Sequence, residues 1–153
     1  MNYKGFIGLG VMGSSIAGHI KKAGYEVTVF NRSEKKAIAW QKLYGGEIAN
    51  SSAELAENCD MVFLCVGNDE DVEEVITGKG GVLESIGPGG IIIDHTTTSA
   101  VLAKKIAIKS LEKEIFFIDA PVSGGEVGAK QGTLTVMAGG DKEAFERSQK
   151  ITL

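Results

Sequence analysis

Three short runs of the chain are continuously apolar, and they restrict the fold more than any other feature of the sequence. They lie at residues 61–66, 90–94 and 115–119. A strand with one face in water alternates apolar and polar residues, whereas a continuous apolar run has to be covered on both faces. Strands of this kind belong to parallel sheets that lie between two layers of helices. The runs therefore predict an α/β fold with a mostly parallel sheet and helices on both faces.

The segments around these runs continue the alternation of strand and helix. Further strands are expected at residues 3–8, 26–30 and 133–138. Helices are expected at residues 11–23, 33–43, 51–57, 69–77, 99–111 and 141–150. Ser33, Ser51 and Ser99 stand where helix N-caps are expected. The order predicts right-handed crossovers and a doubly wound sheet.

Length and charge exclude several classes of protein. The 153 residues are enough for one domain, which is expected to span residues 1–153. Sixteen basic and twenty acidic residues give a net charge of −4, so the chain lacks the basic surface that a nucleic acid or an anionic membrane requires. No apolar run reaches the roughly 18–20 residues of a membrane helix, and no signal-peptide cleavage site is recognisable, which predicts a cytoplasmic protein. No group of His, Cys, Asp and Glu has metal-ligand spacing, so no metal site is predicted.

A glycine fingerprint of the form G-x-G-x-x-G, made by Gly8, Gly10 and Gly13, follows the first predicted strand and opens the first predicted helix. Gly8 permits a tight turn, Gly10 lets a pyrophosphate approach the backbone, and Gly13 lets the helix pack on the strand. The backbone amides of Val11 and Met12, in the first helical turn, would point at the bound anion. The fingerprint predicts a dinucleotide site in a Rossmann-type fold. A helix–strand turn without a ligand is the alternative.

The end of the second predicted strand indicates which dinucleotide binds. NAD-binding folds place an acidic residue about 20 residues after the glycines, where it binds the ribose 2′-hydroxyl. This chain has Asn31, Arg32 and Ser33 there, followed by Lys35 and Lys36. With no carboxylate at that point, Arg32 can bind a 2′-phosphate bidentately and Ser33 can donate a hydrogen bond to it. The sequence favours NADP as the cofactor, with NAD as the alternative.

A third motif, DAPVSGG at residues 119–125, begins at the carboxyl end of a predicted strand, where doubly wound sheets bind their ligands. It continues into a turn that Pro121 stiffens and that contains Ser123, Gly124 and Gly125. Successive exposed amides in such a turn can hold a carboxylate. A flexible glycine turn without a ligand is the alternative.

The two motifs together, FIGLGVMG at residues 6–13 and DAPVSGG at residues 119–125, resemble those of the β-hydroxyacid dehydrogenases. This family includes 3-hydroxyisobutyrate dehydrogenase, tartronate semialdehyde reductase, the glyoxylate/succinic semialdehyde reductases and, more distantly, 6-phosphogluconate dehydrogenase. The resemblance covers essentially the whole chain. It implies the cofactor-binding domain of an NADP-dependent oxidoreductase that transfers hydride between the nicotinamide and a small hydroxy acid or semialdehyde acid.

The resemblance also implies roles for particular residues. It assigns the substrate carboxylate to Ser123, Gly124 and Gly125. It assigns the nicotinamide side of the cofactor to Val66, Gly67, Asp71 and Thr97. The sequence Val66-Gly67-Asn68-Asp69 replaces a Leu-Pro pair that is more usual in the family.

One departure from the family concerns catalysis. The catalytic lysine of the family lies in a Gly-x-x-x-Lys-x-x-Asn pattern on a second, all-helical domain, and this sequence contains no such pattern. The resemblance therefore implies that this chain holds no catalytic residue, lacks the helical catalytic and dimerisation domain, and is inactive alone. The alternative is a stand-alone dinucleotide-binding module without catalysis, against which the Ser-Gly-Gly turn argues.

Two further expectations concern residues outside the motifs. His19 is expected to be a surface or packing residue, and His95 a positioning residue near the site rather than a base. In the family, the helical domain packs on the linking region and supplies much of the dimer contact, so the resemblance implies that an apolar surface near the C-terminus is left uncovered and promotes homo-oligomers. This surface is expected at Leu134, Val136, Met137, Phe145, Ile151 and Leu153.

Overall fold

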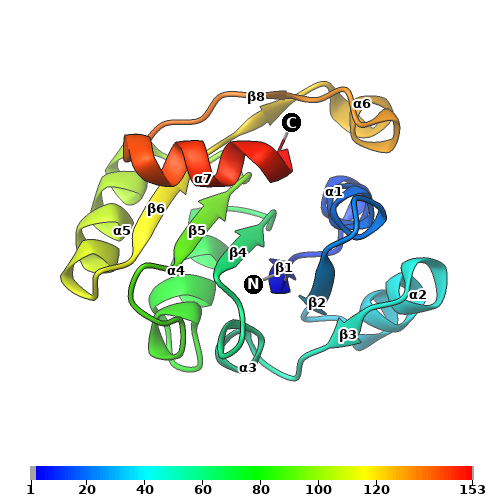
Figure 1. The fold of residues 1–153 in the computed structure, drawn as a ribbon, viewed down its shortest axis with the longest axis horizontal. Coiled ribbons are helices and arrows are strands. Elements are labelled where there is room, and N and C mark those ends of the chain that lie inside the picture. The colour runs from blue at the N-terminus through cyan, green and yellow to red at the C-terminus, as the bar shows by residue number, and fades with distance from the viewer. Residues whose placement is uncertain (1–2, 153) are drawn as a thin grey trace.

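The computed structural model describes residues 3–152 and contains one parallel sheet of six strands in the order β3-β2-β1-β4-β5-β6 (Figure 1). Every neighbouring pair in this sheet is parallel. The strands are β1 Tyr3–Ile7, β2 Glu26–Phe30, β3 Glu47–Ile48, β4 Met61–Leu64, β5 Ile91–Asp94 and β6 Phe116–Asp119. The doubly wound, Rossmann-type sheet predicted from the sequence is confirmed.

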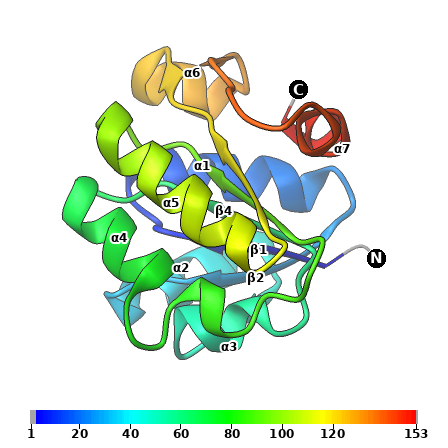
Figure 2. The ribbon, with the colours of Figure 1, turned by 90° about the vertical axis from the view of Figure 1, so that its left-hand side faces the viewer.

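Helices cover both faces of this sheet, as the sequence predicts. The helices are α1 Val11–Lys22, α2 Glu34–Tyr44, α3 Ser52–Ala56, α4 Asp69–Thr77, the 3₁₀ turn η1 Val82–Glu84, α5 Ala100–Glu112, α6 Gly125–Gln131 and α7 Lys142–Thr152. Apolar residues of α3, α4 and α5 form one core with the sheet, and those of α1, α2 and α7 form the other. Accordingly α4 and α7 lie on opposite sides of the strands in Figure 2.

The apolar run of β4 shows why both layers are needed. Val62 and Leu64 pack in the core under α4, whereas Met61 and Phe63 pack in the core under α1. All four side chains are buried, because successive residues of a strand point to opposite faces. Each residue of β4 is therefore covered by one of the two helical layers, as its continuous apolar run predicts.

The register brings the carboxyl ends of four strands to one edge. Ile7 of β1 lies beside Leu64 of β4, which lies beside Asp94 of β5, and Asp94 lies beside Asp119 of β6. The segments that follow these strands all leave from this edge. They contain every motif that the sequence analysis singled out, apart from residues 31–33, which follow β2. Phe30 of β2 pairs with Ile7 of β1, so β2 ends at this edge as well.

The structure adds elements that the sequence analysis did not predict. These are the short strand β3, the 3₁₀ turn η1, the helix α6, and a two-stranded antiparallel sheet of β7 Val122–Ser123 and β8 Thr135–Val136. Of the strand expected at residues 133–138, only two residues pair as β8. Ser51 and Ser99 accept hydrogen bonds from the amides three residues ahead, while Ser33 occupies the N-cap position of α2 without such a bond.

The apolar surface expected near the C-terminus is only partly uncovered. Met137 and Phe145 are exposed, but Val136 and Ile151 are half-buried and pack against the core under α1. Leu153 lies outside the described residues. Within residues 3–152, no helix is both long and apolar enough to cross a bilayer.

Candidate dinucleotide site

The glycine fingerprint forms a tight turn between β1 and α1. Gly8 adopts a φ of +96°, and a Cβ there would lie 2.2 Å from the carbonyl oxygen of Cys65. A Cβ on Gly13 would lie 2.0 Å from the carbonyl oxygen of Gly8. Gly8 therefore needs to be glycine for the tight turn and for the close approach of the segment after β4, and Gly13 needs to be glycine for α1 to pack on the end of β1.

Gly10 is a different case, because packing does not explain it. It is the N-cap of α1, and a Cβ there would meet no atom within 4 Å. The first turn of α1 contains no acidic residue, and Val11 is largely exposed. The N-terminus of α1 thus presents backbone amides and the positive end of the helix dipole to open space, which is the geometry of an anion site.

Asn31 holds this turn in place. Its side-chain oxygen accepts a hydrogen bond from the amide of Leu9 at 2.8 Å, and its side-chain nitrogen donates to the carbonyl oxygen of Ser33 at 3.0 Å. The amide of Gly8 donates to the carbonyl oxygen of Phe30 at 3.0 Å. Asn31 therefore fastens the glycine turn to the end of β2.

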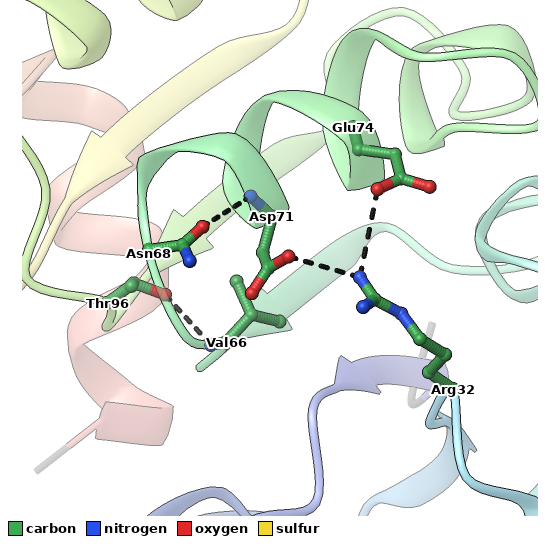
Figure 3. Close-up of polar contacts among 6 residues, drawn as sticks. All are labelled: Arg32, Val66, Asn68, Asp71, Glu74 and Thr96. Atoms are coloured by element: carbon green, nitrogen blue, oxygen red, sulfur yellow. Dashed lines mark hydrogen bonds and ion pairs between the residues drawn. The ribbon is translucent and has the colours of Figure 1, made fainter.

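Arg32 extends from the loop after β2 toward α4 (Figure 3). Its Nη2 lies 3.1 Å from Oδ1 of Asp71 and 3.7 Å from Oε2 of Glu74. None of the residues 31–33 is acidic, and the structure brings the carboxylates of Asp71 and Glu74 to Arg32 from α4. This approach could not be predicted without the sheet order. Strands β2 and β4 both neighbour β1, so the segments that follow them face each other.

The loop after β4 is tied to the loop after β5. The amide of Val66 donates to Oγ1 of Thr96 at 2.9 Å, and Oδ1 of Asn68 accepts from the amide of Asp71 at 2.9 Å, so that it caps α4 (Figure 3). A Cβ on Gly67 would lie 2.7 Å from Oδ2 of Asp71. The Asp71 side chain, expected on the nicotinamide side, is thus directed toward Arg32.

Thr97 and the predicted carboxylate turn are exposed. Thr97 lies in the loop after β5, and Ser123, Gly124 and Gly125 join β7 to α6. The two glycines have φ values of +133° and +62°, a region that side chains other than glycine rarely adopt. The motif that the sequence analysis took for a turn therefore continues directly into a helix.

His19 joins the helix that follows this turn to the helix that follows the glycine fingerprint. Its Nε2 lies 2.8 Å from the carbonyl oxygen of Ala129 and 3.1 Å from that of Lys130, in the last turn of α6. A protonated Nε2 donates to these carbonyls and fixes α6 against α1. His19 is therefore a packing residue, and it holds together the two helices that begin at the predicted pyrophosphate and carboxylate sites.

Buried polar groups lie at the ends of β4, β5 and β6. Asp94 is fully buried, and burial raises the pKa of its carboxyl to about 7. Burial also raises the pKa of Asp119 and of the Cys65 thiol, the latter to about 11, and lowers the pKa of His95. His95 is held by the carbonyl oxygen of Ala120, 2.8 Å from its Nδ1. Each of these shifts disfavours the charged form of its group, and the hydrogen bond to Ala120 fixes the ring of His95.

The raised pKa of Asp94 predicts how stability depends on pH. Between the ordinary value of 3.8 and the folded value of about 7, the unfolded chain has lost a proton that the folded chain still holds. The contribution of Asp94 to stability is therefore complete below 3.8 and is lost as the pH rises toward and through about 7. Urea unfolding should show a smaller decrease from pH 5 to pH 8 in Asp94→Asn than in the parent chain.

The comparison with the variant removes the contributions of other groups, including His95, whose lowered pKa acts in the opposite direction. An equal decrease in both chains would contradict the prediction. The variant can keep the hydrogen bond that Oδ1 of Asp94 accepts from the amide of Thr96 at 2.9 Å.

Comparison with known proteins agrees with this geometry. Residues 4–152 match the family described as the NAD binding domain of 6-phosphogluconate dehydrogenase. The chain is 45% identical to a probable 3-hydroxyisobutyrate dehydrogenase-like protein of Arabidopsis thaliana, over 93% of this chain and 47% of that protein. The chain thus spans about half the length of such relatives.

Solved structures give the same result. The 3-hydroxyisobutyrate dehydrogenase of Mycobacterium tuberculosis with L-serine superposes with a TM-score of 0.92 at 29% identity, over 99% of this chain and 51% of that one. Psf3 in complex with NADP⁺ and 2-OPP also gives 0.92 at 29% identity, over 97% and 52%. With a family match over nearly its full length and the fingerprint in the predicted turn, the chain belongs to the β-hydroxyacid dehydrogenase family as its N-terminal NAD(P)-binding domain.

Proposed function

We propose that this chain binds NADP, in preference to NAD, for an enzyme that transfers hydride between the nicotinamide and a small hydroxy acid or semialdehyde acid. The observation that carries the proposal is the open space at Gly10, in front of the N-terminus of α1. Gly10 differs from other unconstrained glycines in its place at the open N-terminus of α1, where the lack of a side chain lets a ligand approach the backbone. The cofactor pyrophosphate would bind there to the amides of the first turn.

The preference for NADP is supported by the end of β2. Asn31 occupies the place of the ribose-binding acid, and both ends of its amide are used to hold the glycine turn. The side chain of Arg32 is 75% exposed, and its contacts with Asp71 and Glu74 engage only Nη2, so its remaining N–H groups can reach a 2′-phosphate. A structural relative, Psf3, is described in complex with NADP⁺.

The substrate half of the proposal depends on Ser123, Gly124 and Gly125. These residues join β7 to α6, and His19 holds α6 against α1. A small carboxylate bound at this turn would lie beside the carboxyl edge of the sheet, at which the cofactor is proposed to bind. When bound, the nicotinamide would supply the hydride, and this chain's residues would position the two partners. Association with itself and a cytoplasmic location stay predictions from the sequence.

The alternative is a dinucleotide-binding module without catalysis. Such a module would have the same cofactor site as the domain of an enzyme. It would differ only in that its Ser-Gly-Gly turn binds no substrate. Two successive glycines with positive φ favour the enzyme, because a turn of this kind can present successive backbone amides to a carboxylate.

Gly10→Ala tests the cofactor site. The added methyl group has room in the folded chain, so the thermal midpoint should not fall, whereas NADPH affinity measured by calorimetry should decrease about tenfold or more. Gly87→Ala is the matched control, because a Cβ there also meets no atom within 4 Å and lies at the opposite edge of the sheet. Unchanged NADPH affinity in Gly10→Ala would refute the assignment.

Arg32→Ala tests the preference for NADP. Loss of a charged, largely exposed hydrogen-bond donor should weaken NADPH binding about tenfold and leave NADH binding nearly unchanged. Lys42→Ala removes an exposed positive charge from the far end of α2 and serves as the control. Equal affinities of the parent chain for NADPH and NADH would contradict the proposal.

The chain alone should have negligible dehydrogenase activity. It lacks the family's lysine pattern, and loss of a general acid–base group typically lowers the rate about 10²–10⁴-fold. NADPH absorbance should stay constant with succinic semialdehyde, glyoxylate or tartronate semialdehyde. Turnover at an ordinary enzymatic rate would show that a group within the chain supplies the proton.

A further inference from the structure

Arg32, the residue proposed to bind the 2′-phosphate, already has two negative partners. Its Nη2 lies 3.1 Å from Oδ1 of Asp71 and 3.7 Å from Oε2 of Glu74 (Figure 3). The two acids are three residues apart on α4, so they lie on the same face of that helix. The positive charge of Arg32 thus faces the negative charges of Asp71 and Glu74, and these three side chains together carry a net charge of −1.

The two acids differ in how firmly they are held. The side chain of Asp71 is 26% exposed, its backbone amide is bound by Asn68, and its Oδ2 lies against Gly67. The side chain of Glu74 is 72% exposed, and its distance to Arg32 is longer. When a phosphate arrives at Arg32, Glu74 can rotate into water, whereas Asp71 is restrained close to the incoming charge.

These contacts do little to position Arg32. Its side chain is 75% exposed, and ion pairs between exposed side chains contribute little to a fixed geometry, because entropy and solvent offset the attraction. Solvent weakens the repulsion of a 2′-phosphate in the same way, but a phosphate monoester carries about two negative charges at neutral pH, so each acid repels it about twice as strongly as it attracts Arg32 at the same distance. The two acids therefore repel a 2′-phosphate more than they stabilise the position of Arg32.

We propose that Asp71, and to a smaller extent Glu74, lowers the affinity of Arg32 for a 2′-phosphate and thereby limits how strongly the chain discriminates NADPH from NADH. This inference rests on the proposed function, because it assigns specificity within the same site. The selectivity of the chain is then determined by α4 as well as by the end of β2.

The experiment compares Asp71→Asn and Glu74→Gln with the parent chain by calorimetry with NADPH and with NADH. Asp71→Asn should bind NADPH about threefold to tenfold more tightly, as removal of one unit charge a few ångströms away predicts, and Glu74→Gln should gain less. NADH affinity should stay within about twofold, because NADH has no 2′-phosphate. The gain should diminish in roughly 1 M salt, where screening acts within about 3 Å.

Glu70→Gln is the matched control, because it removes the same charge from the first turn of α4. Glu70 is exposed and, among residues 3–152, forms no ion pair. Its NADPH affinity should be close to that of the parent chain. Glu74→Gln leaves the Asn68 cap of α4 untouched, so the test remains decisive if Asp71→Asn folds poorly, which circular dichroism would reveal.

The outcomes separate this inference from the proposed function. An unchanged or lower ratio of NADPH to NADH affinity in both variants would overturn the inference alone. A loss of NADH affinity in Asp71→Asn would also overturn it, because Asp71 would then be a ligand of the ribose. A parent chain that binds neither dinucleotide would overturn the proposed function, and this inference with it.

Discussion

The structure depends on covering both faces of its central strands. Val62 and Phe63 are consecutive and completely buried, yet they lie in different cores. Each layer of helices has to supply half of that burial, so the chain crosses the sheet repeatedly with parallel strands. Parallel strands end at the same edge. The requirement for two-sided burial therefore also gathers the segments after β1, β4, β5 and β6 into one region.

Close backbone packing gives this edge its shape. Gly8 and Gly13 have no side chains because a carbonyl oxygen occupies the position that a Cβ would need. This contact fixes the direction of α1, and Asn31 fixes the turn that precedes it. Gly10, between them, is not required by packing. Gly8 and Gly13 thus shape the turn that leaves the N-terminus of α1 open at Gly10.

The charges around the site follow burial. Behind the loops, burial raises the pKa of Asp94 to about 7 and lowers the pKa of His95, so the charged form of each side chain is disfavoured. Charged groups lie at the rim, where Arg32 meets the acids of α4 in contact with water. A ligand that enters this region meets an electrostatic pattern assembled from several loops. Its affinity depends on their combined charge rather than on one motif.

The sequence by itself determined the elements whose signals are local. These include the continuous apolar strands, the glycine spacing, and the caps at Ser51 and Ser99, because each depends on residues within one or two turns of chain. Tertiary structure decided the two-residue strands β7 and β8 and the approach of Asp71 to Arg32, 39 positions apart. The spatial order β2-β1-β4 is not the order of the chain. Strand pairing therefore determines which side chains face each other across the site, and local sequence patterns do not reveal strand pairing.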